Sequence, residues 1–238
     1  MVRYTEDKKI FIKILYWGCA AGGKTTAVDT LYQLCSEPPK EQSTDKPQIE
    51  VIPTGTLKKI AMASGSTLYF DRGIFQSKKE KSLYYHVFTV AGQQRFGNTR
   101  KILFEDTDGV IFVVDSQKSR LQDNIDSLKE LKRVANGKLI SVIPLLVMLN
   151  KRDLDDVITL EEWEDVMKEA GLLHEPSNPL SEWNPIIYQT VALYNNAQNV
   201  YRIFSECARR CVVYTVWGDG KAPERENKVK LPPDVPDL

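Results

Sequence analysis

One segment, Gly-Cys-Ala-Ala-Gly-Gly-Lys-Thr at residues 18–25, limits the possible folds of this chain more than any other. It fits the pattern G-x-x-x-x-G-K-[ST], in which glycines let the backbone approach phosphates and consecutive N–H groups donate to them. An apolar run at 10–17 precedes it, and apolar residues at helical spacing follow from 24 to 35. A strand, a glycine loop and a helix in this order indicate a phosphate-binding loop, and the alternative is a glycine-rich turn with a solvated lysine.

The residues of this loop have distinct expected roles. The backbone N–H groups and the helix N-terminus would hold the phosphates, and Lys24 would add a full positive charge beside the outer ones. The hydroxyl of Thr25 would bind Mg²⁺. The residues that we expect to contact a nucleotide here are Gly18, Cys19, Ala20, Ala21, Gly22, Gly23, Lys24, Thr25 and Thr26.

Strand-like and helical segments alternate along the rest of the chain. Apolar runs predict strands at 83–90, 109–115, 143–149 and 186–191, and helical spacing predicts helices near 120–136, 160–170 and 197–213. Two S/T-x-x-E/Q patterns, Ser119 with Gln122 and Thr159 with Glu162, predict capping boxes at two helix starts. The fold class is therefore α/β, a phosphate-loop NTPase domain over residues 1–217 with a mostly parallel central sheet flanked by helices.

Composition excludes several other classes of protein. The 238 residues carry 32 basic and 32 acidic side chains, so no net positive charge attracts nucleic acid. The four cysteines lack metal-ligand spacing, and neither a leader, a membrane span nor a lipid anchor is indicated. We expect a cytoplasmic protein, with a long mobile loop at 36–58 and a disordered tail at 218–238.

The base is indicated by a second motif, Asn-Lys-Arg-Asp at 150–153, which resembles the guanine motif N-K-x-D. The carboxylate of Asp153 would accept from guanine N1–H and N2–H, a pair of donors that adenine does not offer. Asn150 would brace the phosphate loop, and the aliphatic stem of Lys151 would cover the purine ring. The alternative is that residues 150–153 form an ordinary polar loop. An ATP-dependent kinase with this phosphate loop is possible only under that alternative.

Two further elements fit a GTPase. At 189–193, Ala192 stands where Ras-like proteins place a small residue whose N–H reads guanine O6, and Leu193 stands where a lysine is usual. At 89–93, Gly92 would donate its N–H to the γ-phosphate and Gln93 would orient the attacking water, unless Gln93 is a surface residue in a turn. Thr89 replaces the aspartate of D-x-x-G-Q, which normally holds Mg²⁺ through water.

Together these segments resemble the MglA-type group of small Ras-like GTPases, known for bacterial cell polarity and gliding motility, over roughly residues 8–213. Thr89 in place of the aspartate is itself a trait of that group. The residues that carry the resemblance are Tyr16, 18–26, 66–71, 89–93, 109–116 and 150–154.

The resemblance implies a GTP/GDP switch with Mg²⁺ and a roadblock-domain (MglB-like) protein as its activator. Thr67 would contact both Mg²⁺ and the γ-phosphate. The arginine finger that commonly precedes that threonine is Ser66 here, and Arg72 or Arg95 would have to replace it. Because such a finger contributes about 10³ to 10⁵ in rate, we expect slow hydrolysis, with Gln93, Lys24 and Thr67 as the catalytic residues.

Two function classes remain open at this point. The first is a molecular switch that hydrolyses GTP slowly and with the help of a partner. The second is a GTP-binding scaffold that recruits partners with negligible hydrolysis. The rate of turnover separates the two.

Overall fold

The structure is a computed structural model of the chain, and it describes residues 3–4, 8–36, 48–61, 69–90 and 97–224. Within these ranges, no helix is both long and apolar enough to cross a membrane. Every helix and strand below lies in the described ranges.

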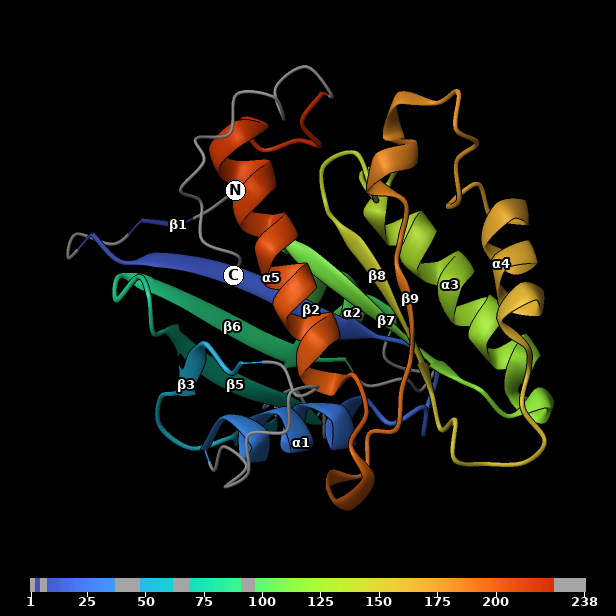
Figure 1. Ribbon diagram of the computed structural model, residues 1–238, viewed down its shortest axis with the longest axis horizontal. Helices are drawn as coiled ribbons and strands as arrows, with labels where there is room; N and C mark the ends of the chain where they lie inside the picture. Colours follow the sequence, from blue (N-terminus) through green and yellow to red (C-terminus); the bar gives the residue numbers. More distant parts are fainter. Residues whose placement is uncertain (1–2, 5–7, 37–47, 62–68, 91–96, 225–238) are drawn as a thin grey trace.

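A single sheet forms the centre of the domain (Figure 1). Its strand order is β3-β5-β6-β2-β7-β8-β9, with β1 paired to β2 and β4 paired to β5. The strands β6, β2, β7, β8 and β9 run parallel to one another. The pairs β1–β2, β3–β5, β4–β5 and β5–β6 are antiparallel. The strands are β1 (Arg3–Tyr4), β2 (Ile10–Trp17), β3 (Val51–Pro53), β4 (Lys58–Ala61), β5 (Tyr69–Ser77), β6 (Leu83–Thr89), β7 (Gly109–Asp115), β8 (Leu145–Asn150) and β9 (Ile187–Gln189).

Five α-helices cover the two faces of the sheet in the described part of the chain. The helices α1 and α5 pack on one face, and α2, α3 and α4 pack on the other (Figure 1). The bounds are α1 (Lys24–Ser36), α2 (Gly97–Phe104), α3 (Leu121–Ala135), α4 (Leu160–Glu169) and α5 (Val200–Trp217), with 3₁₀ turns at Lys118–Arg120, Pro179–Trp183 and Tyr194–Asn196.

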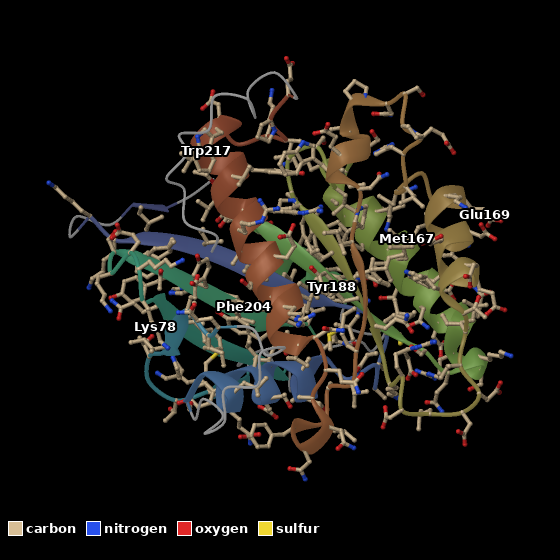
Figure 2. The ribbon with its side chains drawn as sticks, viewed as in Figure 1. Lys78, Met167, Glu169, Tyr188, Phe204 and Trp217 are labelled. Carbon is tan, nitrogen blue, oxygen red and sulfur yellow. The ribbon has the colours of Figure 1, made fainter. Side chains whose placement is uncertain are left out.

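Alternating side chains of the central strands build a separate core on each face. In β2, Ile14 belongs to the core under α1 and α5, whereas Leu15 belongs to the core under α2, α3 and α4. Phe204 of α5, labelled in Figure 2, is fully buried, and its ring lies 5.5 Å from that of Phe75 in β5. Every residue of β7 and β8 is buried because helices cover both faces, as expected for parallel strands.

Three expectations differ from the structure. The segment at 36–58 was expected to be a loop, yet β3 and the first residue of β4 lie inside it, and 37–47 falls outside the described residues. The tail was expected to be disordered from 218, yet the N–H of Ala222 donates to Ser141 O at 2.8 Å and Trp183 Nε1 donates to Pro223 O at 3.0 Å. Residues 225–238 fall outside the described residues.

The third difference concerns helix starts. Thr159 and Glu162 form the expected capping box, with both reciprocal hydrogen bonds present. The box predicted for Ser119 and Gln122 is absent: α3 begins after Arg120, no side chain caps it, and Ser119 lies in the preceding 3₁₀ turn. That turn continues directly into α3, so Ser119 is not at the helix boundary.

Candidate functional site

The glycine loop at 18–23 joins the end of β2 to the start of α1, where the carboxyl ends of β2, β7 and β8 lie together (Figure 1). This edge is where ligands bind in open parallel sheets. The first glycine is required because the loop passes close to β7: a Cβ on Gly18 would lie 2.1 Å from Val113 O.

The lysine of the loop is buried. Lys24 Nζ donates to Gly18 O at 2.9 Å and to Cys19 O at 2.5 Å, so the loop curves around the ammonium group. Burial lowers the pKa of Lys24 to about 8, and the positive charge of Arg100 lowers the pKa as well. Phosphate oxygens would be strong acceptors for this ammonium group, and their charge would raise the pKa again.

Asn150, at the end of β8, connects the phosphate loop to the loop after β9. Its Nδ2 donates to Gly22 O at 2.9 Å, and its Oδ1 accepts from Ala192 N at 3.0 Å. Asn150 is 2% exposed, and a Cβ on Gly23 would lie 2.2 Å from its Nδ2. The side chain therefore fixes both loops, which is the bracing expected of the first residue of the guanine motif.

The amide expected to read guanine O6 has a partner within the protein: the N–H of Ala192 donates to Asn150 Oδ1 at 3.0 Å. The O6 contact of Ala192 stays a prediction. Thr30 Oγ1 of α1 donates to Ala192 O at 2.6 Å. In the trans peptide between Ala192 and Leu193, the N–H of Leu193 points opposite to the C=O of Ala192. The N–H of Leu193 therefore points away from α1, and among the described residues it donates to no backbone or side-chain acceptor.

The other residues of the guanine motif differ in their surroundings. Lys151 adopts φ +67° and its Nζ lies 2.6 Å from Asp115 Oδ2, a carboxylate that is 1% exposed at the end of β7. Asp153 is exposed and borders a cavity of about 740 Å³ beside the loop that contains Tyr194 and the start of α5. Its carboxylate is therefore accessible to a ligand in solution.

The residues present fit a magnesium ion that is held chiefly by the nucleotide. Thr25, the second residue of α1, is exposed and offers a neutral hydroxyl oxygen, which is a hard ligand of the kind Mg²⁺ prefers. Thr89 ends β6 and is 3% exposed. Among the described residues, no group of three or more histidine, cysteine or acidic side chains is placed to hold a metal ion. Phosphate oxygens and water would complete the ion's shell.

Several expected site residues fall outside the described residues: Ser66, Thr67, Gly92, Gln93 and Arg95. Nothing is described of the side chain of Arg72 in β5 either. Their roles stay predictions.

The sequence reasoning missed three residues that hold this site together: Thr30, Asp115 and Arg120. Asp115 carries the one available signal, because it is an acidic residue directly after a buried parallel strand. Thr30 and Arg120 contact the site from positions 162 and 100 residues away from their partners, so no local pattern identifies them.

Comparisons with known proteins bear on the family of this chain. The model of the ADP-ribosylation factor family matches residues 1–196. The "Mutual gliding-motility protein MglA" of Myxococcus xanthus (strain DK1622) is 29% identical over 174 residues, which are 70% of this chain and 80% of that protein.

"ADP-ribosylation factor-like protein 4A" of Homo sapiens is 30% identical over 88 residues, and the Mus musculus protein gives the same figures. The match covers 37% of this chain and 42% of those proteins. The family match spans the phosphate loop, the guanine motif and the whole parallel sheet, and the predicted α/β fold class and the GTPase assignment are confirmed. The chain therefore belongs to the ADP-ribosylation factor family of small GTPases, in agreement with its resemblance to the MglA-type group.

Proposed function

We propose that this GTPase is a cytoplasmic switch that hydrolyses GTP slowly with Mg²⁺, relies on a roadblock-domain partner for faster turnover, and serves cell polarity or motility. The observation that best supports nucleotide binding by this switch is the position of Asn150. Its side chain joins the phosphate loop to the loop at Leu193 through Gly22 O and Ala192 N. Because one side chain fixes both ends of the site, phosphates and base would be bound as one rigid unit. The polarity or motility role is supported only by the name of the Myxococcus xanthus relative, the "Mutual gliding-motility protein MglA".

The proposal of guanine as the base rests on Asp153 and Leu193. The exposed carboxylate of Asp153 would accept from guanine N1–H and N2–H, and the N–H of Leu193 would donate to O6. We assign O6 to Leu193 because the N–H of Ala192 is already bonded to Asn150.

Slow hydrolysis is supported by the chemistry of the site. Ala20 and Ala21 bring side chains into a loop where glycines are usual in Ras-like proteins, and Ser66 supplies no charge for the developing transition state. Thr67, Gly92 and Gln93 would complete the site around the γ-phosphate. A scaffold that binds GTP without hydrolysis is the second candidate, since buried Thr89 offers no carboxylate to hold a Mg²⁺-bound water.

Turnover by the purified full chain tests the proposal. The protein is incubated with Mg²⁺ and either GTP or ATP, and both bound nucleotide and released phosphate are followed over several hours. The switch predicts bound GDP, a slow release of phosphate from GTP alone, and at least a tenfold slower release for Gln93→Leu. Retained GTP with no phosphate release, even with a roadblock-domain protein added, would favour the scaffold. Equal binding of ATP would reject the guanine assignment.

A further inference from the structure

Arg120 contacts the phosphate loop from outside the known motifs. It ends the 3₁₀ turn before α3, and its Nη2 donates to Ala20 O at 2.9 Å, across 100 residues of sequence. The contact lies at the edge of a cavity of about 640 Å³ between the loop and α3, lined also by Gly18 and Cys19. Neither the motif nor the family match assigns a role to this arginine.

We propose that Arg120 is a positioning residue that holds the Ala20–Ala21 peptide so that the N–H of Ala21 faces the bound phosphates. In a planar trans peptide the C=O and the following N–H point in opposite directions. Because the carbonyl of Ala20 points to Arg120, the N–H of Ala21 points away from Arg120. This proposal rests on the proposed nucleotide binding.

The backbone supports this interpretation. Ala21 adopts φ +61°, a left-handed conformation that costs a residue with a Cβ about 1–2 kcal/mol and needs support from its surroundings. The same arrangement recurs two residues later, where Asn150 holds Gly22 O and Gly23 adopts φ +99°. Two carbonyls held outward, each followed by a residue with positive φ, form the concave row of N–H groups that binds anions. Asn150 orients one of these peptides and Arg120 orients the other.

The guanidinium group is itself held in place by two carboxylates. Nη1 of Arg120 lies 2.6 Å from Asp123 Oδ2, and Nε lies 3.9 Å from Asp115 Oδ2. The same oxygen of Asp115 lies 2.6 Å from Lys151 Nζ. A single buried carboxylate therefore lies between Arg120, which contacts the phosphate loop, and Lys151 of the guanine motif. Loss of Arg120 would therefore affect the contacts of both the phosphates and the base.

This role is separable from folding. The side chain of Arg120 is 34% exposed and that of Asp123 is 48% exposed, so their ion pair contributes little to stability in water. Arg133 lines the same cavity, is exposed, and makes no hydrogen bond to the phosphate loop within the described residues, which makes it a matched control.

The experiment measures dissociation rates of GDP and GTP, as fluorescent analogues, from the full-length protein and from Arg120→Ala, Arg120→Lys and Arg133→Ala. Losing one charge-assisted hydrogen bond to the loop should speed dissociation from Arg120→Ala by about tenfold or more. Arg120→Lys should recover part of the effect, Arg133→Ala should match the wild type, and all nucleotide-free forms should unfold at similar denaturant concentrations.

Three results would overturn the proposal. Wild-type dissociation rates in Arg120→Ala would show that the contact does not position the loop. Faster dissociation that is accompanied by lower nucleotide-free stability, with no recovery in Arg120→Lys, would show a general structural role. If the wild-type protein bound neither nucleotide, the proposed function itself would fail, and this outcome is recognised before any variant is compared.

Discussion

One close approach in the site is between a glycine and an amide side chain. Gly23 adopts φ +99°, and the position of a Cβ there lies 2.2 Å from Asn150 Nδ2. The same amide donates to Gly22 O, so the glycine is needed both for its backbone conformation and for the space it leaves. The second glycine of the motif thus serves the guanine motif as well as the phosphates.

Gly23→Ala should therefore weaken GDP binding by at least tenfold, because Asn150 must move out of its contact with Gly22 O. Gly137→Ala is the matched control: Gly137 adopts φ +77° in a turn after α3, with no atom within 4 Å of an added Cβ. It should lose about 1 kcal/mol of unfolding free energy from backbone strain and keep its nucleotide affinity. Calorimetric titration with GDP and denaturant melts check both variants. Equal GDP affinities would show that the clash is relieved without disturbing the loop.

At this scale the sequence predicts what is local. Roles for Lys24, Thr25 and Asp153 can be predicted from spacing because each lies within a short motif. The partner of each carbonyl and carboxylate cannot be read, since Thr30 reaches Ala192 across 162 residues and Lys151 reaches Asp115 across 36. The proposal that Leu193 and not Ala192 donates to O6 depends on such a contact, since the bond from Ala192 N to Asn150 Oδ1 is a tertiary contact between two loops.

Among the elements, the parallel strands were predicted best. The expected bounds of the strands at 10–17 and 109–115 match β2 and β7 because both are largely apolar runs with helices on both faces. The antiparallel strands β3, β4 and β5 were missed, since β3 and β4 are short and β5 carries charged and polar residues. Such strands form because they pair with a neighbouring strand, and the local pattern of apolar residues in the sequence does not predict which segments pair.

The two predicted capping boxes offer a test of helix starts. In Thr159→Ala, α4 loses the acceptor for Glu162 N, now at 3.1 Å, and should lose about 1 kcal/mol of unfolding free energy. Ser119→Ala should change it by less than about 0.5 kcal/mol, since Ser119 is exposed and caps no helix. Urea melts of both variants at neutral pH make the comparison. An equal loss in both would mean that side-chain capping does not distinguish the two starts.

Across the whole molecule, a charged cluster on α5 secures the chain after α4 to the domain. Arg210 is 4% exposed, and its Nη1 donates to Trp183 O and Asn184 O, both at 3.0 Å. Trp183 in turn donates to Pro223 O, so the end of the described chain is held through the same residues. Glu206 completes the cluster by accepting from Arg210 Nε at 2.8 Å and from Arg209 at 2.7 and 2.8 Å.

The carboxylate of Glu206 should make this arrangement sensitive to acid. Burial alone would raise the pKa of Glu206, but hydrogen bonds and charges from Arg209 and Arg210 outweigh it and hold the pKa below its usual range. The unfolded chain therefore binds the proton first as the pH falls, so this stabilisation is present above the unfolded pKa of about 4.3 and is lost as the pH falls through the lower folded value.

Glu206→Gln should consequently cost about 1–3 kcal/mol of unfolding free energy at neutral pH, because a neutral amide replaces the charged carboxylate that pairs with the buried guanidinium of Arg210. The difference from the wild type should shrink only below about pH 4, where the wild-type carboxylate also becomes protonated. Asp165→Asn is the control, since its pair with Lys168 is exposed and should contribute little at any pH. Denaturant melts across this pH range measure all three proteins. A difference for Glu206→Gln that stays constant from neutral pH down to about pH 3 would show that its stabilisation comes from packing and not from charge.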